Sequence, residues 1–179
     1  MEHSTWLNAL FENLENFEQE GRATVAYLRA HRTKIAFKKN KPSTGAWWTV
    51  GGNINLNSLY YSYDTSLTET RVFTLIIHEV RHLQQGFLTA LSVYGEMDAW
   101  QLEWNIYYRL HQRYPHPAIE ELMSLPLGWD RALLRKAVQL MQGYAGKGYR
   151  ADLLPLYPLG KEAGYRLFKR IPGPATQSA

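Results

Sequence analysis

The chain contains no cysteine among its 179 residues. A disulfide framework is therefore excluded, and so is any metal site with thiolate ligands. A metal ion bound by this protein must be held by histidine and carboxylate side chains. The absence of cysteine is compatible with every cellular compartment, so it does not locate the protein.

Long apolar runs are also missing from the sequence. No segment approaches the roughly 20 apolar residues that a helix needs to cross a bilayer. The first residues do not combine a basic start with an apolar run, as a secretory signal does. From these two absences we expect a soluble, cytoplasmic protein that has no membrane partner.

The excess of positive charge is small, since the formal net charge is +4 at pH 7. Such a balance favours acidic partners without identifying any of them. The basic stretch from Lys38 to Lys41, followed by Trp47 and Trp48, has the composition of a nucleic-acid surface. A solvated loop between two strands explains the same residues more simply. We therefore expect no nucleic-acid partner.

Hydrophobic residues make up 45% of the chain, and its length suits one domain with a substantial core. We expect a mainly helical α+β domain over residues 1–170. Helices are predicted over residues 4–31, a sheet and a metal-site core over 34–112, and further helices over 116–170. Residues 171–179 are predicted to be a disordered tail.

Three short segments have the composition of strands. Residues Lys34–Lys38 alternate polar and apolar side chains, as a half-buried strand does. Residues Trp47–Val50 and Asn53–Leu56 predict a pair of strands joined at Gly51 and Gly52. We expect these segments to form a small antiparallel sheet.

A pair of histidines four residues apart follows an apolar run and is the central motif of the chain. On an α-helix, His78 and His82 lie on one face and can bind one ion. Glu79 is rotated by about 100° from His78, so its carboxylate lies beside such an ion and can accept a proton from water. This is the H-E-x-x-H pattern of zinc hydrolases.

The segment that carries this motif is apolar on nearly all sides, which is typical of a helix buried inside a domain. Buried histidine and glutamate side chains need partners, and a metal ion supplies one. Ser66 and Glu69 have the spacing of a capping box, so the helix is predicted to begin near Ser66 and to end at Gly86. A second helix is predicted from Tyr94 to Leu110.

A catalytic zinc takes three protein ligands and leaves one position for water, so the two histidines need a third partner. Glu96 and Asp98 are the candidates, and on one helix they point in nearly opposite directions, so only one can face the ion. We favour Glu96. Glu103 can either orient a ligand histidine through its free ring nitrogen or lie on the surface. Arg81 is turned away from the ligands, and we expect it in a salt bridge.

A group that stabilises the oxyanion is also needed by many zinc peptidases. The sequence offers four candidates and does not choose among them: His111, His116, Tyr144 and Tyr149.

The two motifs together, His78-Glu79-x-x-His82 and Glu96-x-Asp98-Ala99, resemble those of the gluzincin metallopeptidases. The chain is similar to the short members of that group, the minigluzincins and the ImmA/IrrE-type peptidases. The resemblance covers roughly residues 46–105. It implies a zincin-like fold with a small sheet before the motif helix, a Zn²⁺ cofactor, His78, His82 and Glu96 as zinc ligands, and Glu79 as the general base.

The metzincin pattern is absent, because Gln85 and Leu88 stand where that group has a glycine and a third histidine. A di-iron bundle would need a second Glu-x-x-His unit, and no other glutamate has a histidine three residues later.

Two functions are compatible with these motifs. The first is a zinc-dependent metallopeptidase that hydrolyses peptide bonds of a protein or peptide substrate. The alternative is a catalytically inactive, zincin-like metal-binding protein with a regulatory or interaction role. Glu79 favours the enzyme, because a purely structural metal site does not need it.

Overall fold

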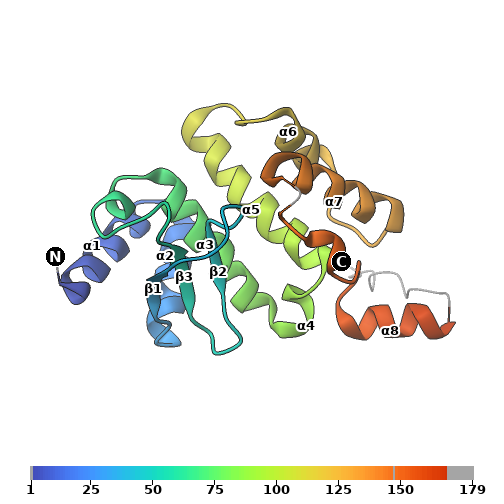
Figure 1. Ribbon diagram of the computed structural model, residues 1–179, viewed down its shortest axis with the longest axis horizontal. Helices are drawn as coiled ribbons and strands as arrows, with labels where there is room; N and C mark the ends of the chain where they lie inside the picture. Colours follow the sequence, from blue (N-terminus) through green and yellow to red (C-terminus); the bar gives the residue numbers. More distant parts are fainter. Residues whose placement is uncertain (1, 147, 169–179) are drawn as a thin grey trace, which may run out of the picture.

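Helices dominate the structure, and one small sheet lies beside them (Figure 1). The computed structural model describes residues 2–146 and 148–168. In chain order the elements are α1 (His3–Glu15), α2 (Glu18–Ala30), β1 (Ile35–Lys38), β2 (Ala46–Trp48), β3 (Ile54–Asn57), η1 (Thr65–Leu67), α3 (Thr70–Gln85), α4 (Phe87–Ala90), α5 (Val93–His111), α6 (Pro117–Ser124), α7 (Arg131–Ala145), η2 (Ala151–Leu153) and α8 (Leu159–Phe168).

The sheet has three strands in the order β1-β3-β2. β2 and β3 form the predicted antiparallel pair, with Trp48 opposite Ile54. β1 runs parallel to β3, with Ile35 opposite Ile54, so the prediction of an antiparallel sheet is wrong for this strand. The reason is that β3 takes the central position, where all four of its residues are buried, and the chain between β1 and β2 passes to the opposite edge. β2 is left as an edge strand.

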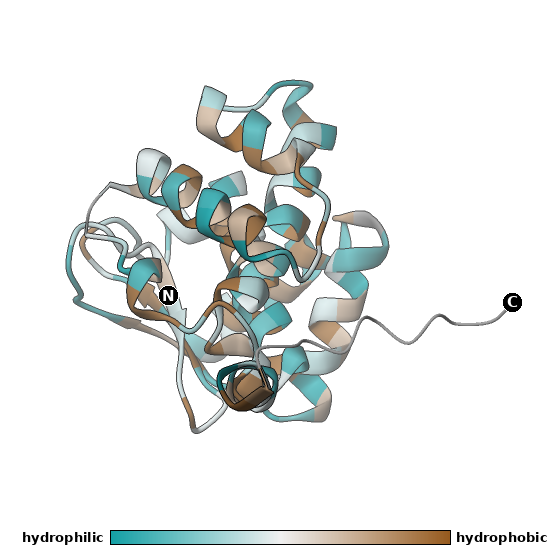
Figure 2. Ribbon diagram, turned by 90° about the vertical axis from the view of Figure 1, so that its right-hand side faces the viewer, coloured by the Kyte–Doolittle hydropathy of each residue, from teal (hydrophilic) through white to brown (hydrophobic). Residues whose placement is uncertain are grey.

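Two hydrophobic cores lie on either side of the packed pair α3 and α5. The first core joins α1, α2 and α3 to the sheet, and the second joins α5 to α6 and α7. Figure 1 shows the first group at the left, the second at the right and α5 between them. Along the helices, apolar and polar residues alternate in the manner of amphipathic elements (Figure 2).

The motif helix α3 begins at Thr70, not near Ser66 as the capping-box spacing predicts. Ser66 lies in the short helix η1, where its hydroxyl accepts a hydrogen bond from the indole of Trp6 at 2.8 Å and donates to the carbonyl of Tyr63 at 3.1 Å. Because its side chain is used in these contacts, it caps no helix. The predicted end is confirmed, since Gly86 follows the last residue with a φ of +74°.

The helices after the motif lie close to their predicted positions. α5 differs by one residue at each end from the predicted helix, and the hydroxyl of Ser92 caps it by accepting from the Gly95 N–H at 3.0 Å. The three α-helices α6, α7 and α8 and the short helix η2 occupy the predicted region 116–170 as far as it is described. The predicted tail 171–179 lies outside the described residues.

Among the described residues, no helix combines the length and the apolar character that a membrane span requires.

Candidate metal centre

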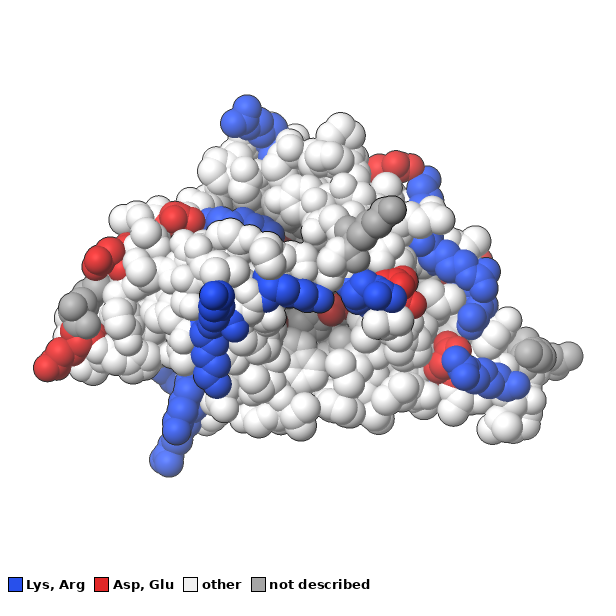
Figure 3. Space-filling view, viewed as in Figure 1, with Lys and Arg blue, Asp and Glu red and all other residues white. Residues whose placement is uncertain are grey.

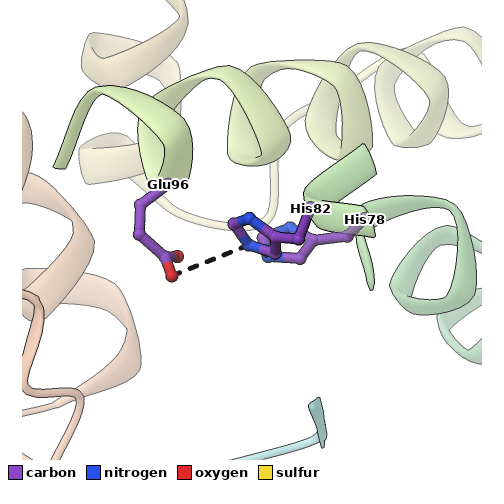
Figure 4. A group of neighbouring side chains, drawn as sticks. All are labelled: His78, His82 and Glu96. Carbon is purple, nitrogen blue, oxygen red and sulfur yellow. Dashed lines mark hydrogen bonds and ion pairs between the residues drawn. The ribbon is translucent and has the colours of Figure 1, made fainter. Parts of the chain in front are cut away.

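Three side chains converge where α3 meets the first turn of α5 (Figure 4). His78 and His82 place their Nε2 atoms 3.0 Å apart, as expected for residues one helical turn apart. The Oε1 atom of Glu96 lies 3.6 Å from Nε2 of His82. One ligand atom from each residue lies within 4.8 Å of the others. The sequence therefore predicted a set of residues that the fold brings together.

The start of α5 is held close to the chain before it, and this places Glu96. A Cβ atom on Gly95 would lie 2.2 Å from the carbonyl oxygen of Thr89, so only glycine permits this approach. The cap of Ser92 fixes the same turn. Glu96 then projects its carboxylate toward the two imidazole rings (Figure 4).

His82 is oriented by polar groups on the side away from the cluster. Its Nδ1 lies 3.2 Å from the amide oxygen of Gln85, whose NH₂ group donates to Asp98 at 2.7 Å and to the Gly95 carbonyl at 2.9 Å. Asp98 also accepts two hydrogen bonds from Arg81, at 2.7 and 3.1 Å. Asp98 therefore lies outside the cluster, and Arg81 forms the expected salt bridge.

His78 is oriented from the opposite side. Its Nδ1 lies 2.8 Å from Oε2 of Glu103, a close contact whose geometry is not that of a hydrogen bond. Glu103 is buried and forms an ion pair with Arg71, whose guanidinium lies over the Trp104 ring at 4.4 Å. Of the two alternatives for Glu103, the surface position is therefore wrong, and the carboxylate lies beside the ring of His78.

The donor atoms of this cluster fit a metal ion. In the tautomer that carries the proton on Nδ1, each ring turns the lone pair of Nε2 toward the other ring and Glu96. Burial lowers the pKa of His78 well below its ordinary value, and the charges of His82 and Arg71 add to this effect. Lone pairs and a carboxylate oxygen that meet without a proton between them repel one another, and a cation removes this repulsion. The three residues are therefore a possible metal-binding site.

Glu79 lies beside the cluster and is only 5% exposed. Its Oε2 accepts a hydrogen bond from the backbone N–H of Trp48 at 2.8 Å, which leaves Oε1 available. Burial and, to a smaller extent, the nearby charge of Glu96 raise the pKa of Glu79 to about 8, and the Trp48 N–H opposes this rise. A bound cation would favour the ionised form.

Of the four oxyanion candidates, only Tyr149 reaches the cluster. Its hydroxyl donates to Oε2 of Glu96 and accepts from the Trp100 indole at 2.8 Å. Burial, followed by the charge of Glu96, raises its pKa well above the ordinary value. His116 instead caps α6, and His111 lies exposed at the end of α5.

Two cavities meet at the cluster, with volumes of about 420 and 610 Å³. Both are lined by His78, Glu79 and Tyr149, and the larger one also by β2, His82 and Glu96. The ammonium group of Lys41 donates to the Gly148 carbonyl at 2.7 Å near the cavities. On the face shown in Figure 3, basic side chains are spread among acidic and uncharged ones and form no single stripe.

The sequence analysis missed three groups of this site: Arg71, Gln85 and the backbone N–H of Trp48. Arg71 and Gln85 lie seven residues before His78 and three after His82, so helical spacing was a usable signal for both. No pattern of side chains marks a backbone N–H.

No protein-family model, curated protein or solved structure matches this chain. The resemblance carried by the two motifs thus has no second line of support from known proteins. The geometry of the cluster and of the residues around it is therefore the basis for a function of this protein.

Proposed function

We propose that this protein is a zinc-dependent metallopeptidase in which His78, His82 and Glu96 hold the metal and Glu79 is the general base. The observation that carries the proposal is the position of Glu79. Its buried carboxyl group lies beside the converging donor atoms and has one oxygen fixed by the Trp48 N–H. A site that used a metal only for structure would not require this group.

Zinc is the metal that suits the donor set of two imidazoles and one carboxylate, which is the composition of known catalytic zinc sites. Such a set leaves a fourth position open. When bound, zinc polarises the substrate carbonyl and lowers the pKa of a water molecule.

Two protein side chains, Glu79 and Tyr149, would carry the proton transfer and the hydrogen bonding to the substrate. Oε1 of Glu79 accepts a proton from the attacking water, while Oε2 stays bonded to the Trp48 N–H. The water oxygen bonds to the carbonyl carbon, the C–N bond breaks, and Glu79 returns the proton to the leaving amine. The Tyr149 hydroxyl donates to Glu96 when no substrate is bound, and it would give up that hydrogen bond to donate to the carbonyl oxygen as negative charge develops on it.

The outer edge of β2 supports a peptide as the substrate. β2 is an edge strand, so the backbone groups on its outer side are not used in the sheet, and it lines the larger cavity beside the cluster. An extended peptide can bind to such an edge through main-chain hydrogen bonds. The two cavities leave room for residues on either side of the bond to be cleaved.

The test combines zinc content with peptide cleavage. Wild type is expected to bind about one zinc per chain and to cleave members of a peptide library. Glu79→Gln is expected to retain zinc and to lose about 10²–10⁴-fold in turnover. Glu121→Gln, a change at an exposed carboxyl paired with Lys136, is the matched control and should behave as wild type.

Turnover by Glu79→Gln at the rate of wild type would remove the proposed mechanism. Zinc binding by wild type without cleavage of any peptide would instead favour the alternative, an inactive metal-binding regulatory protein.

A further inference from the structure

The smaller cavity beside the cluster has an aromatic lining. We call it the aromatic cavity; it has a volume of about 420 Å³, and its wall includes Tyr60, Tyr61, Arg71, Leu75, Trp100 and Tyr144. It shares His78 and Glu79 with the larger cavity, so a residue next to the cleaved bond can enter it. Its volume lies near the lower end of the range of about 300–1,000 Å³ for ligand pockets.

The aromatic cavity has donors and acceptors, which include the Arg71 guanidinium, the tyrosine hydroxyls and the carboxyl groups of Glu79 and Glu103. Tyr61 and Tyr144 line the cavity together with Arg71, and among the described residues neither tyrosine hydroxyl has a hydrogen-bond partner. The carboxylate of Glu103 is already in contact with Arg71 and His78 through its two oxygens. An occupant therefore meets apolar ring surface and, beside Arg71, hydroxyl groups that can bond to an oxygen atom.

We propose that the aromatic cavity binds a tyrosine side chain of the substrate, next to the bond that is cleaved; this inference rests on the proposed peptidase function. The aromatic walls match the ring, and the free hydroxyls match the phenol oxygen. An acidic side chain fits less well, because Glu103 already balances the charge of Arg71 and a buried carboxylate would lack a partner. We therefore expect the cavity to bind a Tyr side chain more tightly than Phe, and both more tightly than Leu, Ala or Glu.

Gly45 offers a way to narrow the aromatic cavity. A Cβ atom added there would lie 3.0 Å from Cδ1 of Leu75 and 3.9 Å from the Tyr61 hydroxyl. Gly45→Val therefore places side-chain atoms in the space assigned to the ring. Gly51→Val is the matched control, because a Cβ there meets only Asn53 and Thr49 at 3.6 and 3.9 Å, outside both cavities.

The probes are acetylated and amidated alanine-rich peptides that carry one variable residue, Tyr, Phe, Leu, Ala or Glu. Cleavage by zinc-loaded wild type is followed by mass spectrometry, which gives kcat/KM and the position of the cut. Binding of the same peptides to zinc-loaded Glu79→Gln is followed by calorimetry. We expect kcat/KM for the Tyr peptide to exceed that for the Ala peptide at least about tenfold, with the cut beside Tyr.

In Gly45→Val the ratio of kcat/KM between the Tyr and Ala peptides should fall at least about tenfold, and in Gly51→Val it should stay as in wild type. Cleavage without a preference for Tyr, a preference for Glu, or an unchanged ratio in Gly45→Val would overturn the inference and leave the peptidase function in place. Selective binding of the Tyr peptide to Glu79→Gln, with no cleavage by wild type, would support the cavity and remove the peptidase. If neither cleavage nor selective binding is observed, both the inference about the cavity and the peptidase function are overturned.

Discussion

The two histidines of the cluster are oriented in the same manner from opposite sides. Nδ1 of His78 lies 2.8 Å from a carboxylate oxygen of Glu103, and Nδ1 of His82 lies within hydrogen-bond distance, 3.2 Å, of the amide oxygen of Gln85. Each acceptor is itself held by a second polar group: Glu103 by an arginine, and Gln85 through Asp98, which is paired with another arginine. If the cluster binds a metal, we expect its affinity to depend on these residues, which would not touch the ion.

Replacing Gln85 tests this dependence. In Gln85→Met the amide oxygen that faces Nδ1 of His82 is lost, so the ring is no longer fixed with Nε2 free toward the ion. We expect zinc affinity to fall about 10–100-fold, measured by competition with a chelator. Gln84→Met, at the exposed neighbouring position of the same helix, is the control and should bind zinc as wild type does. Equal affinity in the two variants would contradict the role of Gln85.

Glu79 makes the stability of the metal-free protein depend on pH. Burial, with a smaller effect from Glu96, raises its pKa from 4.5 to about 8. Between these values the folded chain keeps a proton that the unfolded chain has released, so the free energy of unfolding falls as the pH rises. Glu79→Gln lacks this proton equilibrium, whereas other titrating groups such as His78 are common to both proteins.

We therefore expect Glu79→Gln, with chelator present, to gain stability over wild type as the pH is raised from 5 to 8, by on the order of a few kcal/mol. Urea unfolding at the two pH values measures the difference. A gain of the same size at both values would mean that Glu79 does not titrate in this range.

Helical spacing explains why the clustering of His78, His82 and Glu96 was predictable from the sequence. The offset of four residues between His78 and His82 fixes their common face, and the opposite directions of Glu96 and Asp98 leave one carboxylate for the cluster. The contact of Trp48 with Glu79 depends on where an edge strand passes a helix. Such a contact between distant backbone and side chain has no local signal in the sequence.

At the level of elements, local sequence patterns predicted where the helices and strands lie. They did not predict how the strands pair or which distant side chains the elements contact. The alternation in residues 34–38 marks a strand, yet its parallel pairing with β3 follows from β3 taking the buried central place. Ser66 has the spacing of a helix cap, yet the distant Trp6 uses its hydroxyl. In both cases a tertiary contact overrides the local preference.

The contact of Ser66 with Trp6 should be visible in stability. Ser66→Ala removes the acceptor of a fully buried indole N–H, so a buried donor is left unpaired. We expect the free energy of unfolding to fall by about 1–3 kcal/mol, measured by urea denaturation. Ser58→Ala, at an exposed position, should change it by less than about 0.5 kcal/mol. If Ser66→Ala behaved like this control, the contact would have no role in folding.

At the level of the whole molecule, the candidate metal centre lies between the two hydrophobic cores. His78 and His82 come from α3 of the first core, and Glu96 comes from α5, which contributes to the second. An ion held by all three residues links the helices on which the cores are built. That residues 1–170 form one domain stays a prediction. The effect of zinc on the unfolding of the two cores can test it.

Zinc should stabilise both cores together, because it binds the folded arrangement of α3 and α5 and not the separated helices. At free zinc about 1,000 times the dissociation constant, we expect about 4 kcal/mol of added stability and a higher Tm, with one unfolding transition in calorimetry. Glu96→Ala removes the side chain that α5 contributes to the cluster. Because the ion then no longer connects α5 to α3, added zinc should raise the Tm of this variant much less than that of wild type. A zinc effect that survives in Glu96→Ala would show that the ion is held by α3 alone, and two separate transitions in wild type would show that the cores unfold independently.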